Sequence, residues 1–349
     1  TASWADYNND GWIDLIIGNE SGGDEINNSE LYHNNGDGTF TEKAEDLNLD
    51  LLGFIKGVVW GDVDNDGDQD LYISLLGQPN LLMINEGVDK KWKFTNKALI
   101  AGVEEPISSF PAWFFDFDND GWLDIWVSGY DNSSGHVAMS YLGMYNQGEK
   151  PRLFKNNKDG TFKNVTVKSN MNYPLLTMGS NYGDLNNDGY LDIYAGTGDP
   201  DYRSVQPNRV FLNMEGKYFQ DVTFHGRFGN IQKGHGVSFG DIDNDGDQDI
   251  HAVMGGAYEG NVYQNSLYEN PGNWNNPWIG IKLIGTQTNK AAIGSRIIIE
   301  TIENKIIHRA ISSGGSFGGN PFREFIGLSK TKGVSKITIM WGSGNQQSL

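Results

Sequence analysis

The sequence predicts an all-β protein: a β-propeller of about five four-stranded blades, followed by a small β-rich, sandwich-like domain. Two observations lead to this prediction. The first is composition, since there are 46 glycines and 10 prolines, asparagine is frequent, and no long run of helix formers occurs. The second is a repeat, because an acidic nonapeptide recurs five times between apolar, β-rich segments. Together they indicate many short strands joined by turns.

The acidic nonapeptide defines the length of the repeat. Its copies read "DYNNDGWID", "DVDNDGDQD", "DFDNDGWLD", "DLNNDGYLD" and "DIDNDGDQD", and they start at Asp6, Asp62, Asp116, Asp184 and Asp241. The spacings between the starts are 56, 54, 68 and 57 residues. Five copies at such similar spacing predict five structural units of one kind.

Each unit contains the pattern of four short strands. An aromatic residue two positions before the loop marks an incoming strand, and an apolar run such as "LIIG" or "IWVS" follows as the outgoing strand. A third strand closes in asparagine, and in the first four units a turn and a final strand follow. A four-stranded meander cannot bury both faces alone, so such sheets stack radially into a propeller. We expect blades near residues 1–50, 51–105, 106–170, 171–228 and 229–275, and a terminal domain at 276–349.

The fifth unit is incomplete. After Asn270 the chain runs through "PGNWNNP" into the C-terminal domain without a fourth strand. Another element must therefore close the ring. The candidates are a segment upstream of residue 1, a strand at residues 278–284, and a strand donated by another subunit.

The acidic loops have the composition of calcium sites. Positions 1, 3, 5 and 9 are Asp or Asn in every copy, and position 6 is glycine, where a sharp turn needs positive φ. Position 7 varies, which suits a ligand offered by its backbone carbonyl. All-oxygen ligands on a flexible loop favour Ca²⁺, whereas zinc or copper sites recruit His or Cys. We predict about five Ca²⁺ ions, one per loop, held by Asp6, Asn8, Asp10, Trp12, Asp14, Asp62, Asp64, Asp66, Asp68, Asp70, Asp116, Asp118, Asp120, Trp122, Asp124, Asp184, Asn186, Asp188, Tyr190, Asp192, Asp241, Asp243, Asp245, Asp247 and Asp249.

Two other interpretations of these loops were weighed. An EF-hand loop begins in the same way but needs a bidentate Glu at position 12 and flanking helices. Position 12 is instead apolar in every copy: Ile17, Ile73, Val127, Ala195 and Ala252. The EF-hand is therefore excluded. The remaining alternative is that the Asp runs are only solvated turns.

The charge balance agrees with metal binding. The formal net charge is −19, and 18 of the predicted side-chain ligands are carboxylates, so nearly all excess acidity lies in the loops. Such a chain is not expected to bind nucleic acid or an anionic membrane. No apolar run approaches the ~18 residues that span a bilayer. Cysteine is absent, which excludes disulfides and thiol catalysis.

These motifs carry two family resemblances. The Asp-x-Asp/Asn-x-Asp-Gly-x-x-Asp loops inside aromatic-flanked hairpins resemble the FG-GAP or VCBS repeats of integrin-α-type propellers. The segments "NPWIGIKLIGTQTNKAAIGSRIII", "SSGGSFGGNPFREFIGL" and "VSKITIMWGSGNQQ" resemble an ASPIC/UnbV domain. The combination is similar to bacterial ASPIC/UnbV proteins and to cartilage acidic protein. The resemblance implies an extracellular or surface calcium-binding propeller used in adhesion or recognition, and it does not imply an enzyme.

A partner surface is expected opposite the acidic loops. In a meander the connections between the second and third strands lie on that face, and three of them are long, at residues 129–151, 196–208 and 255–265. They are rich in tyrosine: Tyr130, Tyr141, Tyr145, Tyr202, Tyr258 and Tyr263. Tyrosine among polar side chains suits a protein or glycan surface.

Three functions are compatible with the sequence. We expect an extracellular, calcium-stabilised structural or adhesion protein that forms a homo-oligomer or filament by strand exchange. The alternative is a carbohydrate-binding, lectin-like propeller. A glycan-active enzyme ranks last, because no nucleophile or base can be named, and we expect no enzyme. The chain begins with Thr1 and shows no signal peptide, so we expect a mature secreted product or a fragment. Asn27, Asn132 and Asn164 lie in sequons that a suitable host would glycosylate.

Overall fold

The computed structural model describes residues 1–130, 133–256, 258–260, 262–272, 275–315 and 317–349. The strands are β1 (Ala2–Ala5), β2 (Asp14–Ile17), β3 (Glu30–Asn34), β4 (Phe40–Glu42), β5 (Ile55–Gly61), β6 (Asp70–Leu75), β7 (Leu81–Asn85), β8 (Phe94–Asn96), β9 (Ser109–Phe115), β10 (Asp124–Gly129), β11 (Arg152–Asn156), β12 (Phe162–Asn164), β13 (Thr177–Gly183), β14 (Asp192–Thr197), β15 (Arg209–Met214), β16 (Tyr218–Asp221), β17 (Gly234–Gly240), β18 (Asp249–Met254), β19 (Ser266–Tyr268), β20 (Trp278–Lys282), β21 (Arg296–Thr301), β22 (Ile306–Ala310), β23 (Arg323–Gly327), β24 (Val334–Met340) and β25 (Gln346–Ser348).

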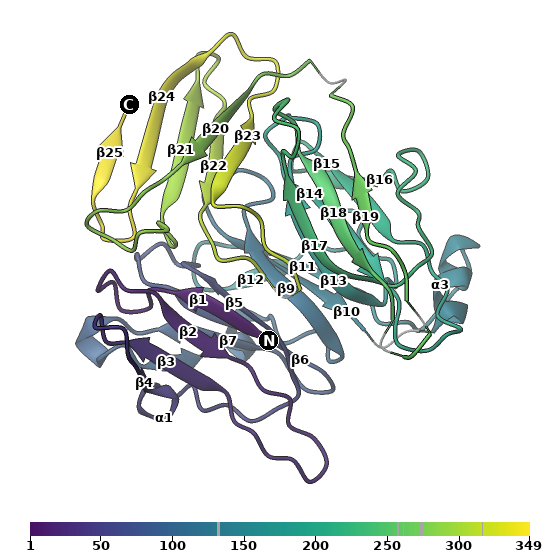
Figure 1. Cartoon of the computed structure of the whole chain (residues 1–349), viewed down its shortest axis with the longest axis horizontal. Coiled ribbons are helices and arrows are strands. Elements are labelled where there is room, and N and C mark those ends of the chain that lie inside the picture. The colour runs from purple at the N-terminus through teal and green to yellow at the C-terminus, as the bar shows by residue number, and fades with distance from the viewer. Residues whose placement is uncertain (131–132, 257, 261, 273–274, 316) are drawn as a thin grey trace.

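Each repeat forms one antiparallel sheet whose strands follow in chain order. We call these sheets blade 1 (β1–β4), blade 2 (β5–β8), blade 3 (β9–β12), blade 4 (β13–β16) and blade 5 (β17–β19), and blade 5 has three strands in the described part of the chain. Figure 1 shows the purple-to-green blades, with the yellow-green C-terminal strands grouped beside them. The predicted all-β, propeller-like fold with a C-terminal β domain is confirmed.

Consecutive blades pack face to face through apolar cores. Ile16 and Leu31 of blade 1 lie in one buried cluster with Trp60, Leu71 and Phe94 of blade 2. Similar clusters join blade 2 to blade 3, blade 3 to blade 4, and blade 4 to blade 5. Burial of this apolar surface is the main stabilising contribution to the stack. The aromatic residue before the acidic loop is therefore a core residue of the blade-to-blade interface in blades 2, 3 and 5.

The C-terminal domain, residues 276–349, is a separate β unit that we call the cap. Its strands form a four-stranded sheet in the order β22-β21-β24-β25 and a two-stranded sheet of β20 and β23. Its core contains Ile297, Ile299, Ile307 and Ile326, all fully buried. Trp278, the first residue of β20, pairs with Gly327 of β23. The hypothesis that a strand at residues 278–284 closes the ring is therefore wrong, because that strand belongs to the cap.

A glycine-rich loop of the cap, described at residues 312–315 and 317–320, contacts the first strands of several blades, and we call these residues the tether loop. Ser313 Oγ lies 3.0 Å from Ser3 Oγ of β1, and the Phe317 ring centroid lies 5.1 Å from that of Phe110 in β9. The Asn320 side chain donates to the Tyr182 carbonyl of β13 at 2.8 Å and accepts from the N–H of Phe239 in β17 at 2.9 Å. The loop thus connects blade 1 with blades 3, 4 and 5. Among the described residues, no strand of blade 1 pairs with a strand of blade 5.

Four short helical segments interrupt the β architecture in the described ranges of the chain. They are α1 (Ala44–Leu47), the 3-10 helix η1 (Val88–Lys90), α2 (Ala98–Ala101) and α3 (Ser134–Tyr141). The sequence predicted only a long loop where α3 lies; the helix begins there because the Ser133 hydroxyl accepts the N–H of His136 as an N-cap. No described helix has the length and apolar character needed to cross a membrane.

Candidate metal centres

Each acidic loop is shaped by the carboxylate at position 1. In blade 1, Asp6 Oδ1 accepts the N–H of Asp10 at 3.0 Å, and Asp6 Oδ2 accepts the N–H of Gly11 at 2.9 Å. The position-1 carboxylates of blades 2, 3 and 4 accept the same two N–H groups. Gly11 has φ +91°, and the position-6 glycines of the other loops also have positive φ, as predicted for a tight turn.

The carboxylate at position 9 fixes the loop to the third strand. Asp124 Oδ2 accepts the N–H of Phe117 at 3.2 Å, and its Oδ1 accepts the N–H of Asn156, the last residue of β11, at 2.8 Å. The other four blades repeat this arrangement. Both oxygens of every position-9 Asp therefore already accept a hydrogen bond from a backbone N–H, although each oxygen has a further lone pair that could bind a cation.

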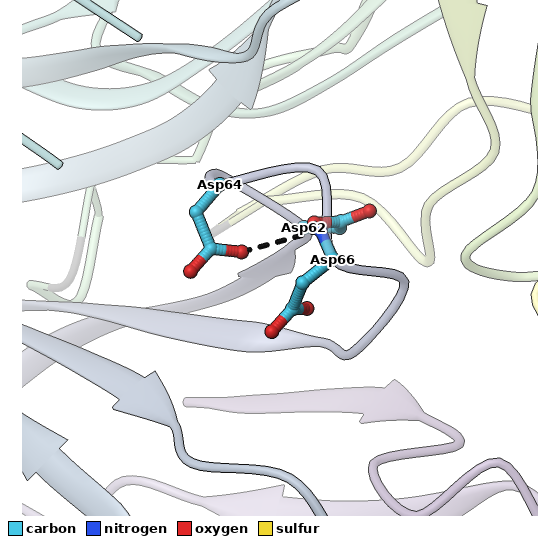
Figure 2. Close-up of side chains that lie close together, drawn as sticks. All are labelled: Asp62, Asp64 and Asp66. Atoms are coloured by element: carbon cyan, nitrogen blue, oxygen red, sulfur yellow. Dashed lines mark hydrogen bonds between the residues drawn. The ribbon is translucent and has the colours of Figure 1, made fainter. Parts of the chain in front are cut away.

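Carboxylates from positions 1, 3 and 5 converge in the loops of blades 2 and 5. One oxygen from each of Asp62, Asp64 and Asp66 lies within 4.8 Å of the others, and Asp241, Asp243 and Asp245 form the same group. Figure 2 shows Asp62, Asp64 and Asp66 on one turn of the chain. In blade 3 the convergent group is Asp116, Asp118 and Asp124. These three loops place oxygens where one divalent ion could contact all of them.

Position 3 is asparagine in the other two loops. Asn8 Nδ2 donates to Asp10 Oδ2 at 2.9 Å, and Asn186 Nδ2 donates to Asp188 Oδ2 at 3.1 Å. Each amide therefore binds the position-5 carboxylate, and Asn186 Oδ1 also accepts the N–H of Asp188 at 3.1 Å. In loops 1 and 4 a neutral amide thus joins positions 3 and 5.

The chemistry of these residues fits Ca²⁺. Asn8 Oδ1 and Asp118 Oδ1, both at position 3, are buried oxygens without a hydrogen-bond partner among the described residues. Burial raises the pKa of Asp6 to about 6, of Asp14 to about 8 and of Asp116 to about 7, although backbone N–H groups oppose the shift. A cation would satisfy the free oxygens and restore ionisation, because an opposite charge nearby favours the charged form.

Loop 3 carries its own positive charge. The ammonium of Lys155 contacts Asp118 and lies 3.1 Å from an Asp120 oxygen, and Lys158 Nζ lies 3.3 Å from the same oxygen. Desolvation lowers the pKa of Lys155, but its hydrogen bonds to the two carboxylates outweigh it and raise the pKa to about 12. An ion at loop 3 would therefore compete with an ammonium group that is held firmly in place.

Asparagine at position 4 links each loop to the next, a role that the sequence analysis missed. Asn9 Nδ2 donates to the Gly67 carbonyl at 3.2 Å, and Asn119 Nδ2 donates to the Gly189 carbonyl at 2.7 Å. Blades 2 and 4 repeat the bond to the following blade. Position 4 has positive φ in all five loops, which Asn tolerates better than most residues. The signal was present, because position 4 is Asn in every copy.

The asparagine that closes the third strand links each blade to the preceding one. Asn156 Nδ2 donates to the Leu123 carbonyl of its own loop at 3.1 Å and to the Val63 carbonyl of the blade 2 loop at 2.8 Å. Blades 2, 4 and 5 make the same pair of bonds. Asn34 of blade 1 makes only the bond within its own blade, to the Ile13 carbonyl at 3.1 Å, among the described residues. The acidic loops are thus one hydrogen-bonded series along the blades.

The cap lies directly on the acidic loops. Arg296 Nη2 is 3.1 Å from Asp62 Oδ2, and Arg309 Nη2 is 3.6 Å from Asp184 Oδ2. The N–H of Gly327 also donates to Asp184 Oδ2 at 3.0 Å, and the N–H of His308 donates to Asn119 Oδ1 at 3.0 Å. Cationic side chains of the cap therefore compensate part of the acidic charge of loops 2 and 4.

The predicted partner surface is only partly assembled by the described residues. Tyr202 and Tyr258 stack with ring centroids 5.7 Å apart, and both are more than half exposed. Tyr145 is 84% exposed. Tyr130 is less accessible, and burial raises its pKa to about 12. Residues 131–132, 257 and 261 of these connections lie outside the described residues. The predicted surface and the homo-oligomer stay predictions.

Two of the three sequons can be placed. Asn27 is exposed. Asn164 is also exposed, but its Oδ1 accepts the N–H and the hydroxyl of Thr166 at 3.1 and 2.7 Å. Asn132 lies outside the described residues.

Comparison with known families identifies the repeat. The FG-GAP-like repeat matches residues 6–73, 132–195 and 184–252, more than half of the chain, and these spans include four of the five acidic loops; the loop at residues 116–124 lies between two of them. The chain belongs to the FG-GAP-like repeat family. Residues 285–349 of this FG-GAP-like repeat protein match the ASPIC and UnbV domain, so both predicted resemblances are confirmed. The two families fit a structural or adhesion role.

Solved structures with similar folds have little sequence identity to the FG-GAP-like repeat chain. The Vibrio cholerae biofilm matrix protein Bap1 covers all of it at 11% identity with a TM-score of 0.43, and the match spans 58% of Bap1. BBS1N in complex with ARL6DN covers 99% at 10% identity with a TM-score of 0.39 and 90% of its own chain. An arginine mutant of AofleA from Arthrobotrys oligospora covers 100% at 10% identity with a TM-score of 0.39 and 92% of its own chain. No curated protein matches the chain.

Proposed function

We propose that this protein is an extracellular structural or adhesion protein whose acidic loops bind Ca²⁺ and thereby stabilise the stack of blades, and that it is not an enzyme. The observation behind the proposal is the pair of buried, unpartnered position-3 oxygens, Asn8 Oδ1 and Asp118 Oδ1, together with the carboxylate oxygens that converge in the loops of blades 2, 3 and 5. Ca²⁺ would supply a binding partner for these two oxygens, in competition with the Lys155 ammonium at loop 3. The asparagine bonds between loops would then transmit the stabilisation of each loop to its neighbours.

The expected stabilisation can be bounded. Extracellular calcium modules have Kd on the order of 10⁻⁴ to 10⁻³ M. At a free calcium concentration of about 2 mM, each site would then stabilise the folded state by about 0.6–1.8 kcal/mol. Five independent sites would contribute about 3–9 kcal/mol, which is comparable with the whole stability of an ordinary domain. In the cytosol, where calcium is far scarcer, sites of this affinity would stay largely empty, so the proposed stabilisation requires the proposed extracellular location.

Thermal unfolding with and without a calcium chelator tests the proposal. We expect chelation to lower the melting temperature strongly and calcium, but not magnesium, to restore it. Asp120→Ala should weaken the response, whereas the exposed Asp159→Ala, whose carboxylate accepts only from its own turn, should leave it unchanged. A melting temperature that is the same in chelator and in calcium would contradict the proposal.

A carbohydrate-binding function is the second candidate. The stacked pair of Tyr202 and Tyr258 favours it, because exposed aromatic rings on a rigid scaffold suit the faces of sugars. The test is glycan binding at saturating calcium. Loss of binding in Tyr202→Ala would support this candidate if Tyr218→Ala, a variant of an exposed tyrosine elsewhere on the protein, still binds. Absence of binding across a broad glycan set would rule it out.

A further inference from the structure

Blade 5 ends in an unpaired sheet edge in the part of the chain that is described. Its sheet order is β17-β18-β19, whereas the other blades continue to β4, β8, β12 and β16. The chain after β19 leads to β20, which pairs with β23 of the cap. The outer edge of β19 therefore presents backbone groups that another strand can pair with.

The fourth strands of blades 1 to 4 all pair with the third strand in one register. An aromatic residue lies opposite the closing asparagine, in the pairs Phe40↔Asn34, Phe94↔Asn85, Phe162↔Asn156 and Phe219↔Asn213. In blades 2, 3 and 4 this aromatic is at most 8% exposed and lies in the apolar cluster shared with the preceding blade. The fourth strand thus inserts one ring between two blades.

One residue of the third strand anchors the end of the fourth strand. In blade 4, the N–H of Val222 donates to the Val210 carbonyl at 3.0 Å, and Thr223 Oγ1 accepts the N–H of Val210 at 3.1 Å. In blade 3, Val165 and Thr166 bind Leu153 in the same way, at 2.9 Å each. The sequences of these strands, "FKNVT" and "FQDVT", share the pattern Phe-x-Asx-Val-Thr.

Leu267 is the residue of blade 5 that corresponds to these anchors. It stands three positions before the closing Asn270, as Leu153 stands before Asn156 and Val210 before Asn213. Leu267 is 57% exposed, whereas both counterparts are fully buried. By the shared register, the N–H and C=O of Leu267 face the open edge. Leu153 and Val210 are buried in the clusters shared with the following blade, so the exposure of the Leu267 side chain reflects the outer face of blade 5, and the open edge is shown by the sheet order.

A groove lies beside this edge where the aromatic ring would sit. It has a volume of about 610 Å³ and is lined by apolar residues of blades 4 and 5 and the segment between them, among them Leu212, Val222, Phe228, Ile250 and Tyr268. All five belong to, or pack against, the cluster that joins blades 4 and 5. This is the cluster equivalent to those that hold Phe94, Phe162 and Phe219 in the earlier interfaces.

We propose that the β19 edge and this groove form a docking site for an extended strand of the pattern Phe-x-Asx-Val-Thr from a partner polypeptide. The strand runs antiparallel to β19, its Phe lies opposite Asn270 with the ring in the groove, and its Val and Thr bind the backbone of Leu267. The inference rests on the proposed structural and adhesion function, because it names the edge through which another chain is held.

Two other occupants fit the site less well. The two strands of this chain that carry the full pattern, β12 and β16, are held in their own blades, with Phe162 8% and Phe219 0% exposed, so a second copy has no such strand to donate. A glycan lacks a peptide backbone, so it would not form the strand-like pair of hydrogen bonds with the N–H and C=O of Leu267. A peptide strand satisfies both the edge and the groove.

The test uses the whole chain at saturating calcium and a labelled synthetic peptide of residues 217–223, "KYFQDVT". We expect saturable binding by fluorescence anisotropy, and hydrogen exchange that slows at the Leu267 amide when the peptide is added. The peptide with Phe219→Ala should bind about tenfold more weakly or worse, because it loses the buried ring. The peptide with Thr223→Val, which keeps the shape but not the acceptor, should bind but leave the Leu267 amide less protected.

Variants of the protein provide the matched control. Leu267→Pro removes the outward N–H and should abolish binding, whereas Leu267→Ala keeps that N–H and should retain it; thermal unfolding confirms that both are folded. Absence of binding by the unmodified peptide overturns the proposal. So does a Leu267 amide that is already protected without peptide, and so does protection that rises with protein concentration, which would assign the edge to a second copy. Failure of the calcium proposal would be seen separately, as a melting temperature that does not respond to chelation.

Discussion

The bond between blades made by the third-strand asparagine can be isolated, because blade 1 provides its own control. Asn156→Ala removes two donors, one to the Leu123 carbonyl within the blade and one to the Val63 carbonyl of the preceding blade. Asn34→Ala removes only the bond within the blade, which Asn34 donates to the Ile13 carbonyl. In both residues Oδ1 accepts the N–H of the residue two positions later, so that loss is common to the two variants.

The magnitude follows from the acceptors that are left unpaired. A buried carbonyl without a partner costs about 1–3 kcal/mol. Asn156 is 3% exposed and would leave two such carbonyls, so the free energy of unfolding should fall by about 2–6 kcal/mol. Asn34 is only partly buried, so water can reach its acceptor in part and Asn34→Ala should cost about 1 kcal/mol, the lower end of the range. The difference between the two variants then contains the bond between the blades together with the deeper burial of Asn156.

Urea unfolding at saturating calcium measures both free energies of unfolding. The dependence of the free energy on urea concentration should be the same in the two variants and in the unmodified protein. Asn85→Ala and Asn213→Ala should match Asn156→Ala, because Asn85 and Asn213 bond to the Tyr7 and Phe117 carbonyls of the preceding loops at 2.9 and 2.8 Å. If the Asn34 and Asn156 variants lose the same free energy within about 0.5 kcal/mol, the bond between blades contributes nothing and the reasoning fails.

Four further predictions follow from the same contacts. Without calcium, the folded chain holds protons on Asp6 and Asp116, with pKa of about 6 and 7 against an ordinary 3.8, so the melting temperature should fall as pH rises from about 5 to 8; saturating calcium should abolish this fall. Lys155→Met removes the competing ammonium and should tighten calcium binding at loop 3 about fivefold. Hydrogen exchange of residues 116–124 during a calcium titration measures this affinity. The control Lys217→Met loses only an ion pair with Glu215 and should leave the affinity unchanged. Arg309→Met leaves the buried Asp184 without its cation and should lower the free energy of unfolding in urea by about 3–5 kcal/mol. Lys330→Met, at an exposed lysine, should lower it little. Equal losses in the two variants would contradict a stabilising role for the Arg309–Asp184 ion pair. Gly318→Ala would place Cβ 2.0 Å from the Val237 carbonyl oxygen and should speed hydrogen exchange in β17, whereas Gly319→Ala, whose nearest neighbour lies at 3.4 Å, should not.

The strands and acidic loops could be predicted because they depend on local pattern. The period-2 apolar runs, the glycine at position 6 and the carboxylates at positions 1 and 9 each act within one hairpin. Position 9 shows where local reasoning stops. Asp124 was predicted as a metal ligand from its residue type, whereas its two hydrogen bonds to Phe117 and Asn156 show that it also shapes the hairpin. Its role as a ligand stays a prediction.

The contacts between repeats could not be derived from one repeat alone. Asn9 and Asn156 donate to carbonyls 58 and 93 residues away, and nothing local distinguishes such a donor from an ordinary turn asparagine. The identity of position 4 in all five copies was the available signal. Docking of Arg296 and Arg309 on the acidic loops depends on how two domains meet, which neither periodicity nor spacing encodes.

The position of the tether loop in the sequence affects how the protein is made. A ribosome delivers the chain from the N-terminus, so each new blade can pack on a finished neighbour as it emerges. The tether loop leaves the ribosome after all five blades, yet it contacts β1 of blade 1, which is synthesised before the other four blades, through Ser313 and Ser3. The growing stack must therefore keep the space between the first strands of the blades free until the tether loop has been synthesised. A product of premature termination would retain every acidic loop and still lack the connection from blade 1 to blades 3, 4 and 5.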